Sequence, residues 1–95
     1  MGNMNRPLPG EQTGEMNDTG TGKMKFLVLH NDDYHTFDYV IRSLIEVCDH
    51  DPRQAEQCTY LVHYKGSCDV LKGGYRQLVP YREGLSSRDL KVTIE

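Results

Sequence analysis

Two short polar groups hold the side chains of this chain that are best suited to chemistry. Residues 30–34 (His-Asn-Asp-Asp-Tyr) follow a short apolar run directly, and residues 63–66 (His-Tyr-Lys-Gly) end a segment with helical patterning. If the fold brings the two groups together, two carboxylates, one amide and one imidazole can surround a small cation, and an ammonium group has three N–H donors and no acceptor. The pattern therefore favours a site for a protonated amine, and it needs no catalytic nucleophile.

Length and composition limit what the chain can be. A chain of 95 residues with 37% hydrophobic content can form one domain with a modest core. The net charge of -3 argues against a nucleic-acid partner, which requires a clustered basic patch. The N-terminus has no apolar signal core, and no apolar stretch approaches the roughly 18 residues of a membrane span. We therefore expect a cytoplasmic, monomeric protein without a membrane partner.

The cysteines predict neither a disulfide framework nor a cofactor site. Cys48, Cys58 and Cys68 are odd in number and lie ten residues apart, a spacing that fits no zinc or redox pair. Free cysteine commonly behaves as a small hydrophobic side chain. We expect three reduced, mostly buried thiols and no bound cofactor.

The composition divides the chain near Lys23. Residues 1–23 contain five glycines and two prolines, with Leu8 as their one branched aliphatic side chain. Such a segment buries too little apolar area to offset its ordering entropy. The sequence predicts a flexible arm over residues 1–23 and a folded domain over residues 24–95.

The first half of the domain has a clear pattern. Residues 24–29 predict a buried strand, and Thr36 predicts the N-cap of a helix. Asp51 followed by Pro52 predicts the start of a second helix, which Gly66 ends in a left-handed C-cap. An apolar stripe marks the buried face of the first helix: Phe37, Val40, Ile41, Leu44, Ile45 and Cys48.

The second half is less definite. Residues 67–71 predict a short strand that Gly73 and Gly74 interrupt, and residues 90–94 predict a closing strand. Residues 75–88 are ambiguous: they could support a short helix beginning at Pro80, which Gly84 would weaken. The order predicts an α+β fold, a β-α-α-β-(short α)-β sandwich with a three-stranded sheet and helices packed on one face.

Four segments of the domain are informative in combination: Phe-Leu-Val-Leu-His-Asn-Asp-Asp-Tyr at 26–34, Asp-Tyr-Val-Ile at 38–41, Gln-Ala-Glu-Gln at 54–57 and Val-His-Tyr-Lys-Gly at 62–66. Together they resemble the ClpS family of Clp protease adaptors. The resemblance implies a ClpS-like fold and a non-enzymatic adaptor that works without a cofactor. It further implies binding of N-degron substrates, which begin with a bulky hydrophobic residue, and their delivery to a Clp AAA+ unfoldase, ClpA or a ClpC-like relative.

The resemblance also implies roles for individual residues. It makes Asn31, Asp32 and His63 the groups that hold the substrate's α-amino group. Phe37 and Thr59 stand where members of the family often carry methionine, and we expect this pair to favour Tyr or Phe as the first residue. The implied hydrophobic pocket is formed by Leu29, Phe37, Val40, Thr59, Val62 and Leu90.

The chain departs from the family after Val70. Residues 71–74 (Leu-Lys-Gly-Gly) and a shorter segment containing proline replace the family's long third helix, which contacts the unfoldase. No unfoldase-binding residue can therefore be transferred across this region. Tyr64 and Lys65 remain candidate contacts at the rim of the pocket.

Several alternatives stay open at this level. Asp32 and Asp33 can serve as turn residues that cap the next helix, and His63 can simply complement a helix dipole. A protein-interaction module of the same small fold, such as the C-terminal domain of the ribosomal stalk protein, would not recognise a free N-terminus. The substrate-reading domain of a ubiquitin ligase is disfavoured because the zinc-binding Cys/His array is missing. A metal enzyme is disfavoured because no two histidines share a helical ligand spacing among His30, His35, His50 and His63.

Overall fold

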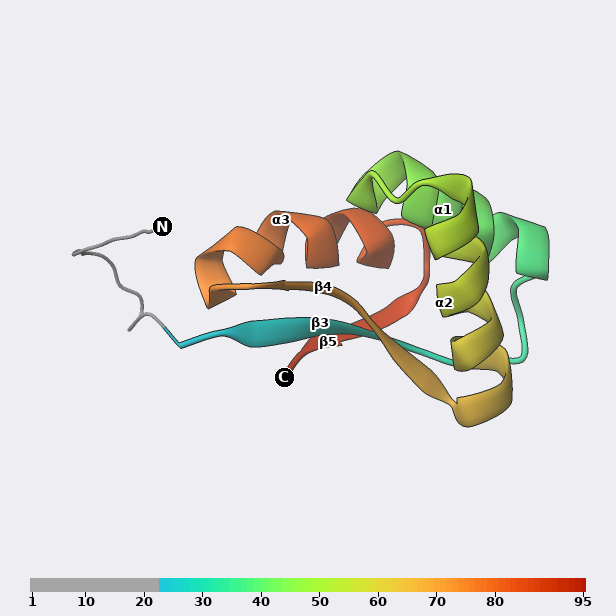
Figure 1. Cartoon of the computed structure of the whole chain (residues 1–95), viewed down its shortest axis with the longest axis horizontal. Coiled ribbons are helices and arrows are strands. Elements are labelled where there is room, and N and C mark those ends of the chain that lie inside the picture. The colour runs from blue at the N-terminus through green and yellow to red at the C-terminus, as the bar shows by residue number, and fades with distance from the viewer. Residues whose placement is uncertain (1–22) are drawn as a thin grey trace.

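A three-stranded antiparallel sheet supports three helices in the computed structural model, which describes residues 23–95 (Figure 1). The elements follow one another as β3 (Lys25–His30), α1 (Phe37–Cys48), α2 (Pro52–Lys65), β4 (Ser67–Gly73), α3 (Tyr75–Ser86) and β5 (Lys91–Ile94). Strand β3 lies in the centre, between β4 and β5. This confirms the predicted α+β class and element order. Apart from Lys23, the predicted arm lies outside the described residues.

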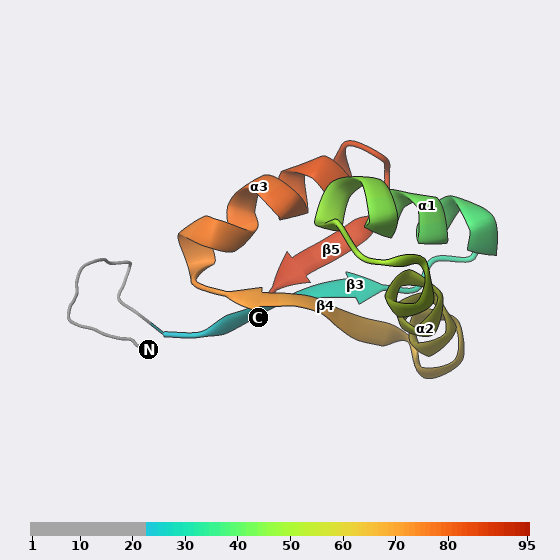
Figure 2. The ribbon, with the colours of Figure 1, turned by 45° about the horizontal axis from the view of Figure 1, so that its top comes forward.

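The helices pack against the sheet through a shared apolar core. Leu27 and Leu29 of β3 are 0% and 1% exposed, and they pack against Leu44 of α1 and Leu78 and Leu85 of α3 in a single core. Figures 1 and 2 show α1 and α3 on the same side of the sheet, and Figure 2 shows α2 nearly end-on below α1. Burying each of these leucines contributes roughly 1.5 to 3 kcal/mol, so this face dominates the stability of the domain.

The predicted caps of the first two helices are present. The Thr36 side chain accepts a hydrogen bond from the Tyr39 N–H, and Asp51 accepts one from the Gln54 N–H. Gly66 ends α2 with φ 97°, a left-handed conformation that glycine adopts without a steric penalty. These local signals set where α1 begins and where α2 begins and ends.

Strand β4 is longer than predicted and contains an irregularity. The sequence suggested residues 67–71, but pairing with β3 continues to Gly73, opposite Lys25. The register shifts between Leu27 and Val28, which leaves Val70 unpaired in a β-bulge. The Val70 carbonyl instead accepts a hydrogen bond of 2.7 Å from Nε2 of His50, a buried residue of the α1–α2 turn. The His50 side chain, 20 positions earlier in the sequence, therefore supplies the hydrogen-bond partner of the Val70 carbonyl at the bulge.

The prediction of a short helix beginning at Pro80 is wrong. Helix α3 begins at Tyr75 and has 12 residues, the same length as α1, with Pro80 in its interior. The Gln77 side chain caps its start by accepting a hydrogen bond of 2.8 Å from the Gly74 N–H. Proline lacks an N–H and disfavours helix interiors, so the helix is held by packing: Leu78 and Leu85 are buried on its inner face.

Candidate functional site

A cavity of about 340 Å³ opens where β3 ends, between the start of α1 and the second half of α2. Its wall includes all nine residues that the sequence assigned to a site: Leu29, Asn31, Asp32, Phe37, Val40, Thr59, Val62, His63 and Leu90. These residues come from the end of β3, two loops and two helices, so only the tertiary fold brings them together.

A backbone hydrogen bond joins the two polar groups of the sequence. The Asn31 N–H donates to the Gly66 carbonyl at 2.9 Å, which holds the loop after β3 against the end of α2. His63 lies one turn before Gly66 on that helix. The left-handed cap of α2 therefore places the imidazole and the loop on the same side of the cavity.

The Asp32 carboxylate organises the loop. Its Oδ1 accepts hydrogen bonds of 2.9 Å from the backbone N–H groups of both Tyr34 and His35. The His35 imidazole adds a contact from Nδ1, 3.1 Å from Oδ1 and 3.0 Å from Oδ2. Burial by itself raises the pKa of Asp32, but the hydrogen bonds from His35 and Tyr34 outweigh it and hold this pKa below its ordinary value. Asp32 therefore carries a full negative charge at neutral pH and also caps the turn after β3. It does not cap the next helix, because Thr36 is the N-cap of α1.

Asp33 supplies a second carboxylate to the cavity wall. It is exposed, and within residues 23–95 no side-chain hydrogen bond or ion pair reaches its carboxylate. Two neighbouring carboxylates therefore face the same cavity, one fixed by the loop and one free to turn toward a ligand. Such a pair makes this end of the cavity attractive to a cation.

The other walls of the cavity are apolar. Leu29, Val40, Val62 and Leu90 are each less than a tenth exposed and belong to the main core. Thr59 is also buried, and its hydroxyl donates a hydrogen bond of 2.7 Å to the Ala55 carbonyl. Since this bond uses the only hydroxyl proton, the Thr59 oxygen can only accept a bond from a ligand.

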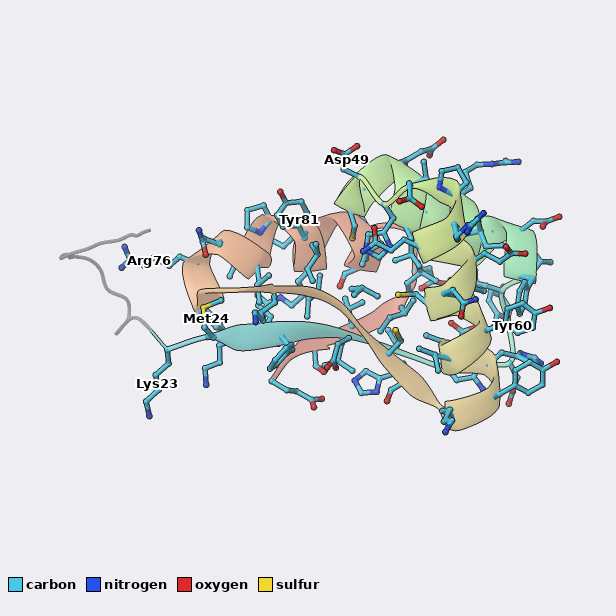
Figure 3. The ribbon with its side chains drawn as sticks, viewed as in Figure 1. Lys23, Met24, Asp49, Tyr60, Arg76 and Tyr81 are labelled. Atoms are coloured by element: carbon cyan, nitrogen blue, oxygen red, sulfur yellow. The ribbon has the colours of Figure 1, made fainter. Side chains whose placement is uncertain are left out.

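Four aromatic rings form a closed set of contacts at the rim. The Phe37 ring lies edge-on to Tyr60 at 5.0 Å and to His63 at 5.8 Å, while Tyr64 stacks on Tyr60 at 5.7 Å and meets His63 at 5.0 Å. Figure 3 shows Tyr60 projecting from α2 at the end of the described domain opposite Met24 and Arg76. The rim therefore lies at one end of the domain, with Phe37 and His63 held by ring contacts.

Four further residues line the cavity beside the nine that the resemblance assigned to it: His30, Asp33, His35 and Thr36. His35 lies three positions after Asp32, the spacing at which an aspartate caps a turn, so this spacing could have identified it. The His30 imidazole instead contacts the neighbouring strand, 2.8 Å from the Thr93 hydroxyl and 3.4 Å from the Glu95 carboxylate.

Within residues 23–95, no three His, Cys, Asp or Glu side chains come close enough to hold a metal ion. In the same residues, no helix has the length and apolar character to cross a membrane.

Comparisons with known proteins agree with this architecture. The family model of the ATP-dependent Clp protease adaptor protein ClpS matches residues 21–93. The ATP-dependent Clp protease adapter protein ClpS of Clostridium acetobutylicum is 46% identical over 44 residues, a stretch that covers 46% of this chain and 44% of that protein. The match therefore spans less than half the length of this curated relative.

A solved structure has the same fold. ClpS2 of Agrobacterium tumefaciens, described as bound to L-phenylalaninamide, superposes with a TM-score of 0.70 at 22% identity, covering 79% of this chain and 98% of that one. Because the family model covers most of the chain, including both polar groups and every strand residue except Ile94, the chain belongs to the ClpS family of ATP-dependent Clp protease adaptor proteins.

Proposed function

We propose that this adaptor binds N-degron substrates, with a free α-amino group and a bulky hydrophobic first residue, and delivers them to a Clp AAA+ unfoldase such as ClpA or a ClpC-like relative. The observation that supports this most is the two-part cavity of about 340 Å³, with carboxylates and an imidazole at one end and buried apolar side chains along the rest. The N-terminal residue of a substrate has two matching parts, because its α-carbon carries both a cationic amine and a side chain.

The polar end would select for a free N-terminus. An α-amino group has an ordinary pKa of about 7.7 to 8.0 and is therefore mostly protonated at neutral pH. In this proposal Asn31, Asp32 and His63 accept its three N–H bonds, and Asp33 adds negative charge. An acetylated N-terminus has one N–H and no charge, which would leave these acceptors desolvated at a cost of about 1 to 3 kcal/mol each.

The apolar walls would select for a bulky side chain. Burial of a Leu or Phe side chain contributes roughly 1.5 to 3 kcal/mol more than leaving it exposed. Alanine would gain much less, so its affinity would be lower by about tenfold or more. The ligand named for the Agrobacterium relative, L-phenylalaninamide, has a primary amine and a benzyl side chain, which supports this reading.

Phe37 and Thr59 would set the preference among bulky residues. The Phe37 ring borders one wall, held edge-on between Tyr60 and His63, while the short Thr59 side chain leaves the floor open. The Thr59 oxygen can accept a hydrogen bond from a tyrosine hydroxyl. It cannot donate one, because its hydroxyl proton is already hydrogen-bonded to the Ala55 carbonyl. This arrangement favours Phe and Tyr over Leu.

The adaptor is proposed to act in the cytoplasm as a monomer, without enzymatic activity or a cofactor. The sequence predicted a shortened segment after β4, whereas helix α3 has 12 residues. The candidate contacts for the unfoldase are Tyr64 and Lys65, which are both exposed in the last turn of α2.

A fluorescence titration with peptides that differ only at their first residue tests the proposal. The set contains Leu, Phe, Tyr, Trp and Ala, together with acetylated Phe as the matched control for charge. We expect micromolar or tighter binding only for the free bulky N-termini, with Phe and Tyr strongest. Equal binding of the free and acetylated Phe peptides would contradict the proposal and favour a plain interaction module. Equal affinities for Leu, Phe and Tyr would contradict the roles of Phe37 and Thr59.

In the Thr59→Met variant, the Phe and Tyr peptides should lose more affinity than the Leu peptide.

A further inference from the structure

His35 separates the candidate site from a second, shallower depression on the surface. It lines both, and the second depression also contains Asp32, Tyr34, Asp89 and Lys91. Its side chain is only 11% exposed, although Tyr34 and Thr36 on either side of it are exposed. Such low exposure in a surface loop means that neighbouring side chains hold the imidazole in one orientation.

The His35 ring is held on three sides. Nδ1 lies 3.0 Å from Asp32 Oδ2, and because an ionised carboxylate only accepts hydrogen bonds, Nδ1 must carry a proton. One face of the ring stacks on Tyr39 of α1, with centroids 4.7 Å apart and planes inclined by 13°. Tyr34 meets it edge-on at 5.2 Å. A ring fixed in this way also fixes the carboxylate to which it donates.

The remaining nitrogen of His35 faces a different set of charges. Nε2 lies 4.0 Å from the carboxylate of Asp89, which is exposed in the turn before β5. Lys91 of β5 shares the second depression. The charged groups that face the ring are therefore Asp32, Asp89 and Lys91. The other titratable groups packed on the ring are the phenols of Tyr34 and Tyr39.

We propose that His35 is a positioning residue for the α-amino site, holding the Asp32 carboxylate in place when neutral and weakening capture of the amine when protonated. This inference rests on the proposed function. The neutral ring leaves Asp32 with its full negative charge, whereas an imidazolium places a positive charge 3.0 Å from the same carboxylate. Histidine is the side chain whose charge commonly changes between about pH 5 and 8, so affinity should fall as the pH is lowered through this range.

The test compares the full chain with two variants, His35→Asn and His35→Ala. Asparagine can place a neutral N–H donor near the position of Nδ1 but cannot be protonated, so it preserves the positioning and removes the titration. Affinity for a free Phe peptide is measured from about pH 5.5 to about pH 8, the range in which imidazole titrates. All three proteins keep His63 and every other titratable group of the site, so the difference between profiles isolates His35.

We expect the wild-type affinity to fall several-fold more than that of His35→Asn between about pH 7 and about pH 5.5. At about pH 7.5, His35→Asn should bind nearly as tightly as wild type, whereas His35→Ala should lose about tenfold because the carboxylate loses its donor. The ¹⁵N signals of the His35 ring in the unliganded protein should show the proton on Nδ1, a readout that does not depend on binding.

The outcomes separate two kinds of failure. Parallel pH profiles for wild type and His35→Asn, with free and acetylated peptides still distinguished, would overturn the role of His35 alone. A proton found on Nε2 of the neutral ring would do the same. Wild-type protein that fails to distinguish the free from the acetylated peptide would overturn the proposed function, and this role with it.

Discussion

At the scale of single residues, Asp32 combines two roles that one substitution can separate. Asp32→Asn keeps the Oδ1 acceptor for the N–H groups of Tyr34 and His35 but removes the negative charge. We expect affinity for a free Phe peptide to fall by about tenfold or more, as a charged hydrogen bond contributes about 1.5 to 3 kcal/mol. The melting temperature should fall slightly, because the ionised carboxylate also stabilises the loop. Asp38→Asn, which removes an exposed carboxylate from the first turn of α1, is the matched control.

Asp32→Ala removes both roles, so it should abolish binding and also loosen the loop. Retained affinity in either Asp32 variant, with an intact fold, would contradict the assignment of this residue.

The contribution of Asp32 to the stability of the fold should depend on pH. Because the folded-state pKa of Asp32 is lowered from its ordinary 3.8, its stabilising effect is present above about pH 4 and is lost as the pH falls through the folded value.

The three thiols should be unreactive in the folded protein. Burial raises the pKa of Cys48 to about 11 and that of Cys68 to about 12, and it also raises the pKa of Cys58. Thiolate is the reactive form, so very little of it exists at neutral pH. We expect a disulfide reagent to modify these thiols slowly in the native state and all 3 rapidly in denaturant. Fast modification of the native protein would show that at least one thiol is accessible.

At the scale of elements, the contact between α1 and α3 depends on a glycine. A Cβ at Gly84 would lie 2.8 Å from Cγ1 of Val47, closer than such atoms can approach. Valine in a helix has one strongly preferred rotamer and cannot easily turn away. Gly84 is therefore needed where α3 passes α1, although the sequence indicated it only as a weak point in a helix.

Gly84→Ala should destabilise the domain by about 1 to 3 kcal/mol, as overpacking does, despite alanine's higher helix propensity. Urea denaturation measures the change. Val47→Ala combined with Gly84→Ala should recover most of the loss, because it removes the clashing methyl group. Ser86→Ala, at an exposed position of the same helix, should have little effect. A Gly84→Ala variant more stable than wild type would show that α3 can shift away from α1 at no cost.

The elements differ in how well their sequence predicts them, for physical reasons. Helix α1 carries its cap at Thr36 and an unbroken apolar stripe, so local sequence determines it. Helix α3 contains Pro80 and is capped by the Gln77 side chain at a glycine, so propensity argues against a helix that packing stabilises. The bulge at Val70 was not predictable either, since the His50 side chain that satisfies it comes from a distant turn.

The features of the candidate site also differ in how well the sequence predicts them. Its nine predicted residues lie around one cavity, because the resemblance to ClpS carried long-range information that periodicity lacks. The spacing of Asp32 and His35 indicates a turn, but the contacts of the His35 ring with Tyr39 and Asp89 arise only in the fold and could not be predicted.

At the scale of the whole molecule, the candidate site lies at the end of the domain where β3 runs into α1, away from Met24 and Arg76 (Figures 1 and 3). The polar end of the cavity is built by the loop after β3 and the end of α2, joined by the hydrogen bond from Asn31 to Gly66. A substrate N-terminus could therefore enter without disturbing the sheet. We expect binding to leave the core strands unchanged.

An NMR titration of the full chain with a Phe-initiated peptide and with its acetylated twin locates the binding site. We expect saturable shifts at the backbone of Asn31 and Asp32 and the ring of His63, with methyl shifts at Val62 and Leu90, for the free peptide only. Strand residues on the open face of the sheet should not move. Shifts at other surfaces, or equal shifts with the acetylated peptide, would contradict the claim that this cavity recognises a free, bulky N-terminus.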